Sequence, residues 1–178
     1  MSYDRKRLKR GTARALENLV EAAREDGFSI LGVSGYRSFA VQGDIYEQRL
    51  SETNLEYVSR YIAKAGASEH QLGLAMDVTT DGVEPLSEAF ARTEEYEWLT
   101  MYAAKFGFII RYLEGGEPET GYAFEPWHIR YVGDEAQAIA DSGLTLEAYV
   151  SKNCPILAFA PARLRRAWAE RPADRLVN

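Results

Sequence analysis

The chain contains only two histidines, and both lie close to acidic residues in segments whose side chains can bind a metal. His70 is followed by Asp77, and His128 ends the segment Glu125-Pro126-Trp127-His128. Neutral imidazole and carboxylate groups are ordinary zinc ligands, and a hydrolytic zinc site uses three protein ligands and leaves one position open. We therefore predict that His70, Asp77 and His128 bind one zinc ion (Zn²⁺).

Two further side chains suit the chemistry of such a site. Glu125 would accept a proton from the activated water and pass it to the leaving amine. The negative charge that develops on the carbonyl oxygen needs a fixed cation. Arg37 is the candidate, because it lies on a tight turn between a predicted strand and a predicted helix, which is a rigid position. A surface salt bridge is the alternative for Arg37.

The spacing of Glu125 and His128 makes a demand on the backbone. In a regular strand the two side chains would point to opposite faces, because successive residues alternate. Pro126 has no backbone donor and is typical of bulges, strand starts and sheet edges. We therefore predict irregular backbone over residues 125–127, with regular pairing resuming at His128. Trp127 is expected to pack behind the metal.

Each fragment alone has a simpler explanation. His70 and Asp77 could form a structural hydrogen-bonded pair, and a Glu-x-x-His pattern is a weak signal by itself. The combination is more specific, because every histidine of the chain is used and each has a carboxylate nearby. Small residues, Gly73 and Ala75, keep the backbone near the first segment uncrowded. The whole pattern favours a metal site.

Hydrophobic periodicity predicts the elements that position these residues. The segment 74–80 alternates as a strand, which turns Asp77 away from Met76 and Val78. Helices and strands show no repeating βαβ order, so we predict an α+β fold, a small mainly antiparallel sheet flanked by helices in a single domain. The predicted strands are 28–34, 74–80, 108–112 and 123–132, and the predicted helices are one stopped by Gly27 and those at 38–50, 55–66, 98–106, 134–142 and 145–151.

Composition restricts the class of protein. Of 178 residues, 46% are hydrophobic and 27% charged, which is ordinary for a globular protein. The formal charge of -6 argues against nucleic acid as a partner. No run approaches the ~18 apolar residues of a membrane span. Cys154 is the only cysteine, which excludes an intrachain disulfide, and its apolar surroundings predict a packed side chain.

A basic segment, Arg5-Lys6-Arg7-Leu8-Lys9-Arg10, lies near the N-terminus. A signal peptide would continue into an apolar stretch, but Glu17, Glu21 and Glu25 follow instead. We interpret the segment as a solvated basic face where the first helix begins. The chain as written is expected to be cytoplasmic, whereas an excised domain could belong to a protein of the cell envelope or to a secreted one.

Four blocks of sequence carry a family resemblance. They are Ser34-Gly35-Tyr36-Arg37-Ser38 with Gln42, Ser68-Glu69-His70-Gln71-Leu72-Gly73-Leu74-Ala75-Met76-Asp77, Gly107-Phe108-Ile109-Ile110-Arg111-Tyr112, and Thr120-Gly121-Tyr122-Ala123-Phe124-Glu125-Pro126-Trp127-His128. In this order they resemble the VanY-like D-alanyl-D-alanine carboxypeptidases, a zinc peptidase family of D,D-carboxypeptidases and D,D-dipeptidases. The likeness covers about residues 12–150.

The resemblance implies the zinc ligands named above, with Glu125 as catalytic base and Arg37 stabilising the transition state. It also implies that Ser68 and Gln42 contact the substrate. The implied activity is removal of a C-terminal D-alanine from peptidoglycan stem peptides or their precursors. We expect a zinc peptidase domain over residues 1–152 and a C-terminal tail with a short helix over 153–178.

The resemblance leaves the scissile bond open. Members of the wider group cleave D-Ala-D-Ala termini, L-Lys-D-Ala termini or L-Ala-D-Glu bonds. The segment before the first helix is short here, and Ala65-Gly66-Ala67 stands where a proline-glycine pair is common. Two alternatives are a non-catalytic module that binds cell-wall peptide, against which the presence of Glu125 argues, and a zinc-free structural domain.

Overall fold

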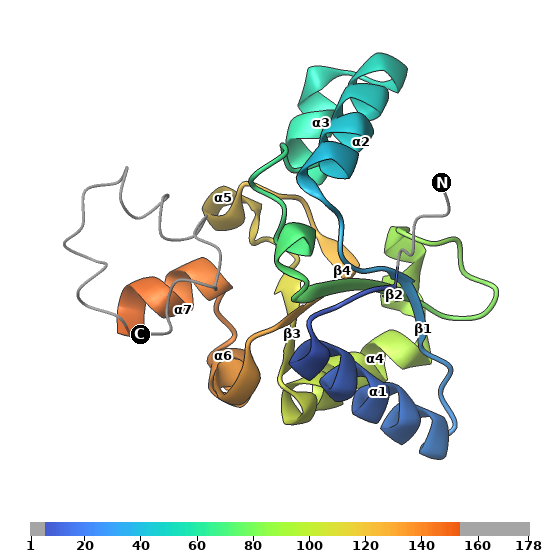
Figure 1. Cartoon of the computed structure of the whole chain (residues 1–178). Coiled ribbons are helices and arrows are strands. Elements are labelled where there is room, and N and C mark those ends of the chain that lie inside the picture. Colours follow the sequence, from blue (N-terminus) through green and yellow to red (C-terminus); the bar gives the residue numbers. More distant parts are fainter. Residues whose placement is uncertain (1–5, 154–178) are drawn as a thin grey trace.

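A four-stranded sheet runs through the middle of this computed structural model, which describes residues 6–153 (Figure 1). Its strands are β1 (Leu31–Ser34), β2 (Ala75–Thr79), β3 (Phe108–Tyr112) and β4 (Glu125–Tyr131), in the spatial order β1-β2-β4-β3. Each neighbouring pair of strands is antiparallel. The predicted α+β class, with a small antiparallel sheet flanked by helices, is confirmed.

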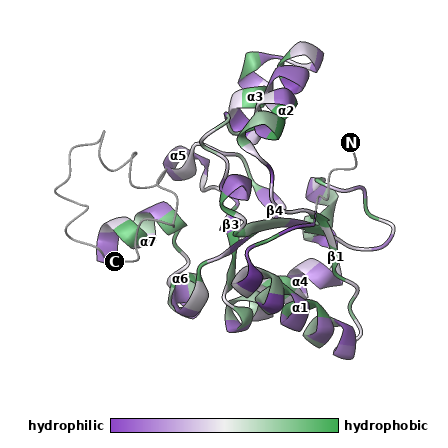
Figure 2. Ribbon diagram, viewed as in Figure 1, coloured by the Kyte–Doolittle hydropathy of each residue, from purple (hydrophilic) through white to green (hydrophobic). Residues whose placement is uncertain are grey.

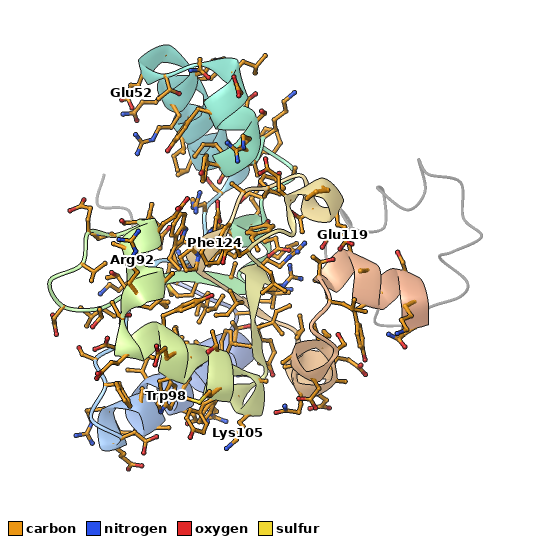
Figure 3. The ribbon with its side chains drawn as sticks, turned by 180° about the vertical axis from the view of Figure 1, so that it is seen from behind. Glu52, Arg92, Trp98, Lys105, Glu119 and Phe124 are labelled. Atoms are coloured by element: carbon orange, nitrogen blue, oxygen red, sulfur yellow. The ribbon has the colours of Figure 1, made fainter. Side chains whose placement is uncertain are left out.

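Helices lie on both sides of this sheet. In Figure 1, α1 and α4 cover one face, α2 and α3 project from the other side as a pair, and α6 and α7 lie beyond the β3 edge. Figure 3 shows Glu52 at the outer end of the α2–α3 pair. The helices are α1 (Arg10–Glu25), α2 (Phe39–Glu52), α3 (Leu55–Tyr61), α4 (Glu94–Tyr102), α5 (Glu117–Thr120), α6 (Ala136–Ser142) and α7 (Leu146–Asn153), and the 3-10 turns are η1 (Glu69–Leu72), η2 (Glu88–Arg92), η3 (Ala103–Phe106) and η4 (Gly133–Glu135).

The hydrophobic core lies between the sheet and the α1–α4 layer. Met76 and Val78 of β2 meet Leu19 of α1 and Trp98 of α4 there, and all four are buried. Figure 2 shows hydrophilic and hydrophobic segments alternating along α1, as expected for a helix with one buried side. Figure 3 shows Trp98 within this helical layer.

Strand alternation separates the core from the opposite face of the sheet. Asp77 lies between Met76 and Val78, and His128 lies between the core residues Trp127 and Ile129. Since neighbouring side chains point to opposite faces, both polar residues are directed away from the core. The predicted alternation of β2 and the predicted packing of Trp127 are confirmed.

Some boundaries differ from the predictions. The first strand begins at Leu31 rather than at residue 28, because the backbone of Phe28 still donates to Ala23 at the end of α1 (2.8 Å). The helix predicted to run from 55 to 66 ends at Tyr61. Between the predicted strands 108–112 and 123–132 lies the short helix α5, which contains Pro118 in its first turn, where the missing proline donor costs no hydrogen bond.

The basic segment before α1 has exposed charged side chains over residues 6–9, as interpreted from the sequence. Its backbone has a second role that composition does not reveal. The carbonyl of Arg7 accepts a hydrogen bond from Tyr36 (2.7 Å), and the amide of Lys9 donates to the carbonyl of Gly73 (2.9 Å). The segment therefore braces the two loops that precede α2 and β2.

Two further predictions concern a membrane-spanning helix and the C-terminal tail. Within residues 6–153, no helix is both long enough and apolar enough to cross a bilayer. Cys154 and nearly all of the predicted tail over 153–178 lie outside the described residues.

Candidate metal centre

Three elements bring the predicted ligands together on the polar face of the sheet. His70 lies in η1, Asp77 in β2 and His128 in β4, and Asp77 and His128 are direct partners across the two strands. One ligand atom from each residue lies within 4.8 Å of the others. All three side chains are buried, with 3%, 2% and 4% of their surface exposed.

Hydrogen bonds orient both imidazole rings toward the aspartate. The His70 ring donates from Nδ1 to the carbonyl oxygen of Gly35 (2.7 Å), because a carbonyl can only accept. This leaves His70 Nε2 facing Asp77 Oδ2 at 3.3 Å. On His128, Nε2 lies 3.4 Å from Glu69 Oε2, and Nδ1 lies 3.1 Å from Asp77 Oδ1. The two rings thus direct different nitrogens to one point.

The chemistry of this donor set fits a divalent cation. Asp77 Oδ1 is buried and accepts no hydrogen bond, although His128 Nδ1 is only 3.1 Å away. A buried carboxylate oxygen without a donor is costly. Two imidazole nitrogens and one carboxylate oxygen are a ligand set that zinc accepts. The second nitrogen of each ring is held by an acceptor, as is usual for metal-binding histidines.

Glu125 reaches this centre through a break in the sheet pairing. Ile110 of β3 pairs with Ile129, but Tyr112 pairs with Glu125, so residues 126–128 of β4 lie opposite Arg111 alone. Pairing with β2 begins only at His128. The predicted irregular backbone before His128 is confirmed. It places Glu125 Oε2 3.6 Å from His128 Nδ1.

The environment of the site raises the pKa of Glu125 and of His128 and lowers that of Asp77. Burial raises the pKa of Glu125 to about 8, and the nearby charge of Asp77 adds to the rise, while His128 and Arg37 oppose it. Burial lowers the pKa of His128, but contacts with Asp77 and Glu69 outweigh this effect and raise it to about 9. The Asp77 carboxyl is buried too, yet the neighbouring histidines hold its pKa far below the usual range. These groups therefore titrate as a coupled cluster.

Arg37 lies between β1 and α2, at the edge of the centre. Its Nη2 donates to Asp77 Oδ2 (3.1 Å) and its Nη1 donates to Gln42 Oε1 (3.0 Å). The backbone amide of Arg37 donates to the carbonyl of His70 (3.2 Å). With 15% of its side chain exposed, Arg37 belongs to the centre and does not form the surface salt bridge that the sequence left open.

The two predicted substrate contacts occupy different positions. Gln42 is fully buried, and its Nε2 donates to the carbonyl of Ala63 (2.7 Å), so both ends of its amide are used within the protein. In this structure Gln42 supports Arg37. Ser68 immediately precedes η1, is 8% exposed, and its side chain forms no capping hydrogen bond. Substrate contact by either residue stays a prediction.

A cleft of about 610 Å³ lies beside the centre. Two of its lining residues connect it to the ligands, one along the sequence and one through contacts between tilted aromatic rings. Ala67, in its wall, precedes Ser68, and Tyr122, also in its wall, packs on Tyr112 (5.1 Å between ring centroids), which in turn lies 5.1 Å from the His128 ring. The cleft is lined by Tyr46, Leu55, Glu56, Ser59, Ile62, Lys64, Ala67 and Tyr122.

Sequence reasoning missed a set of charged residues behind the histidines. Glu69 adjoins His70, and the sequence gives it no role of its own, yet its carboxylate contacts His128 and two arginines, Arg111 and Arg130. Arg111 carried a usable signal, since it is a charged residue inside the otherwise apolar strand Phe108–Tyr112. A cation buried in a strand needs a partner, and the sequence does not name it.

Comparisons with known proteins identify the family. Residues 5–134 match the model of the VanY family, described as D-alanyl-D-alanine carboxypeptidase. The chain is 42% identical over 148 residues to the putative carboxypeptidase YodJ of Bacillus subtilis (strain 168), covering 82% of this chain and 54% of the relative. It is 39% identical over 146 residues to a D-alanyl-D-alanine carboxypeptidase of Enterococcus faecalis, covering 76% and 53%. The chain thus spans about half the length of these curated relatives.

Two solved structures share the fold. The LdcB LD-carboxypeptidase superposes with a TM-score of 0.79 at 40% identity, over 85% of this chain and 72% of that one. A mutant of the vancomycin-resistance D,D-pentapeptidase VanY in complex with Zn(II) superposes with a TM-score of 0.71 at 36% identity, over 84% and 86%.

Proposed function

The chain belongs to the VanY family of D-alanyl-D-alanine carboxypeptidases, and we propose that it is a zinc-dependent peptidase that removes a C-terminal D-alanine from peptidoglycan stem peptides or their precursors. The observation that carries the proposal is the convergence of His70, Asp77 and His128, whose ligand atoms lie within 4.8 Å of one another. The Zn(II) complex of the related VanY pentapeptidase supports the choice of metal. One zinc ion per chain fits this set of ligands, the one set of its kind found among residues 6–153.

The roles of the chain's own residues follow from their positions. Zinc at this centre would supply a Lewis acid that activates a water molecule and polarises the scissile carbonyl. Glu125, beside the ligands, accepts the proton of the attacking water as the new carbon–oxygen bond forms. The same carboxyl then gives the proton to the leaving amine as the carbon–nitrogen bond breaks.

Arg37 supplies the fixed positive charge. Its guanidinium lies beside Asp77 and is held from behind by Gln42, so its position is set before a substrate arrives. A preorganised cation of this kind stabilises the negative charge that grows on the carbonyl oxygen in the transition state. Ser68, at the start of η1, is proposed to contact the peptide, and Gln42 to act through Arg37 or on the peptide directly.

A second specificity has support of its own. The LdcB LD-carboxypeptidase shares 40% identity and a TM-score of 0.79 with this chain, and an L,D-carboxypeptidase DacB from Streptococcus pneumoniae shares 40% identity and a TM-score of 0.71. Cleavage between an L-residue and a terminal D-alanine would use the same cation and the same proton carrier. L,D-carboxypeptidase activity is therefore the alternative to D,D-carboxypeptidase activity.

One assay separates these possibilities. The zinc-loaded protein is incubated with a stem pentapeptide, a stem tetrapeptide and free D-Ala-D-Ala, and the amino acid released from each is identified. Release of D-alanine from the pentapeptide supports the D,D specificity, and release from the tetrapeptide supports the L,D specificity. Binding of these peptides without hydrolysis of any of them would contradict the peptidase proposal and leave a binding module.

The division of the chain made from its sequence is also retained as a proposal, with a zinc peptidase domain over residues 1–152 and a separate C-terminal tail. Glu147 of α7 supports placing that helix within the domain, because it forms an ion pair with Arg111 of the central sheet.

A further inference from the structure

We infer that Glu69 is a positioning residue of the metal centre and fixes the His128 ring with Nδ1 toward the metal. Arg111 holds Glu69 in place, and Glu147 of α7 in turn holds Arg111. The inference rests on the zinc site of the proposed function. It deepens that proposal by extending the centre from its ligands to a helix at the far end of the described chain.

The two oxygens of Glu69 have separate partners. Oε1 accepts hydrogen bonds from Arg111 Nε (2.7 Å) and makes an ion pair with Arg130 Nη1 (2.8 Å). Oε2 is left to face His128 Nε2 at 3.4 Å. Because one oxygen is fixed by two cations, the other has little freedom to move. The carboxylate therefore offers the His128 ring an acceptor at a defined point.

This acceptor decides which nitrogen of His128 is available. A ring that donates from Nε2 to Glu69 keeps its lone pair on Nδ1, the atom that lies 3.1 Å from Asp77 Oδ1. A carboxylate partner also makes the imidazole a stronger ligand. His70 is oriented in the opposite sense by a backbone carbonyl, so the two histidines bind through different nitrogens. The nitrogen that points away from the centre is therefore held by a side chain in His128 and by the backbone in His70.

Arg111 is in turn held by a second carboxylate. Its Nη1 and Nη2 donate to the two oxygens of Glu147 (2.9 and 2.5 Å), while its Nε remains on Glu69. The guanidinium is thus fixed at both ends, with 8% of its side chain exposed. A bidentate arginine–carboxylate pair has a defined geometry that a single contact lacks.

The clamp joins distant parts of the chain. Glu69 lies in η1, Arg111 in the strand β3 opposite the irregular segment of β4, and Glu147 in the first turn of α7. The match to the VanY family model ends at residue 134. The helix α7, which contacts the centre through Arg111, therefore lies outside the matched segment. A purely structural ion-pair network would stabilise α7 without affecting metal binding, and the two roles can be separated by measurement.

The test uses the full chain with zinc alone, without peptide. The variants are Glu69→Gln, Glu147→Gln and, as a matched control, Glu21→Gln, which removes an exposed carboxylate that pairs with Arg24 in a similar bidentate way. Zinc affinity is measured by competition with a chromophoric chelator. We expect Glu69→Gln to bind zinc about 10- to 100-fold more weakly than the wild type does. Glu147→Gln should bind zinc at least about threefold more weakly, and the affinity of the control should not change.

A second readout follows the ring itself. The chain has only two histidines, so a long-range ¹H–¹⁵N spectrum of the zinc-loaded protein contains signals from two rings. The expected spectrum has the proton of His128 on Nε2 and that of His70 on Nδ1. Zinc on Nε2 of His128 would overturn the inference, as would a folded Glu69→Gln variant that binds zinc like the wild type.

If Glu69→Gln does not fold, the zinc affinity of Glu147→Gln tests the inference instead. The Glu147 side chain is 35% exposed, so the loss of its charge is better tolerated. Unchanged affinity in that variant overturns the inference. A wild-type protein that binds no zinc would overturn the proposed function together with the inference. Zinc binding with the expected losses but no peptide hydrolysis would overturn the proposed function alone.

Discussion

At Glu125, burial and an irregular strand act on the same carboxylate. The side chain is 6% exposed, and burial raises its pKa to about 8. The change in β4 pairing brings it to the side of the sheet that carries His128. A divalent cation at the centre would oppose the rise in pKa by stabilising the ionised form. The carboxylate is therefore well placed to take a proton without being a ligand.

Replacement of Glu125 by alanine should abolish proton transfer and spare the metal. We expect kcat/KM for D-alanine release to fall about 100- to 10,000-fold, the usual contribution of a general acid–base group, while zinc content stays near the wild-type value. Peptide assays and elemental mass spectrometry measure the two quantities. Glu21→Ala, on the exposed side of α1, is the control and should keep full activity. A Glu125→Ala enzyme as fast as the wild type would remove this residue from the mechanism.

Arg37 should act on the transition state more than on the substrate. We expect Arg37→Ala to lower kcat about 100- to 1,000-fold, as for loss of an oxyanion-stabilising group, with a smaller change in KM. Arg49→Ala, which removes an exposed arginine of α2, is the matched control. An increase in KM at constant kcat would instead assign Arg37 to ground-state binding of the peptide.

Among the elements, the turn between η1 and β2 has a strict backbone requirement. Gly73 adopts a left-handed conformation (φ +65°), and a Cβ there would lie 3.1 Å from the backbone nitrogen of Lys9. The same residue accepts the hydrogen bond from Lys9 that braces this turn. Both ligands of the first motif, His70 and Asp77, flank the turn, so its conformation sets their separation.

Gly73→Ala should therefore weaken zinc binding as well as stability. We expect a loss of about 1–3 kcal/mol in the free energy of unfolding from the left-handed backbone alone, and a measurable fall in zinc affinity because the brace to Lys9 is displaced. Gly82→Ala is the control, since its φ is +77° and nothing lies within 4 Å of the added methyl group. Equal zinc affinities in the two variants would show that the Lys9 contact does not matter to the centre.

The elements also show which features were predictable. The alternation around Asp77 and the irregularity signalled by Pro126 are local, so sequence spacing and proline chemistry were sufficient. The partners of Glu69 were not predictable in this way. Its contacts with Arg111, and those of Arg111 with Glu147, depend on the strand order β1-β2-β4-β3 and on where α7 packs. Periodicity gives neither of these.

The turn that carries the first ligand was harder to predict from the sequence. The turn η1, which carries His70, has no hydrophobic period of its own and was not predicted. Its shape comes from contacts with other segments, such as the hydrogen bond from Arg37 to the carbonyl of His70. The candidate ligands could thus be named from residue types, whereas the orientation of their rings required the whole fold.

For the whole molecule, metal binding and stability should be linked, because His128 of β4 is distant in sequence from the other two ligands, His70 and Asp77. At a free zinc concentration 100 times Kd, binding adds about 2.7 kcal/mol to the free energy of unfolding. For a chain of this size that corresponds to a rise in Tm of roughly 5–10 °C. Thermal melts with zinc, and again after chelation, measure it. An identical Tm in both conditions would argue against a centre that spans the fold.

The most direct test of the account is the zinc content of the protein. The wild type, purified without chelators and dialysed, is analysed by elemental mass spectrometry beside His70→Ala, His128→Ala and the control Glu21→Gln. We predict close to one zinc per chain in the wild type and in the control, and loss of zinc in both histidine variants. A wild-type protein without zinc that also fails to take it up on addition, or histidine variants that retain it in full, would contradict the account.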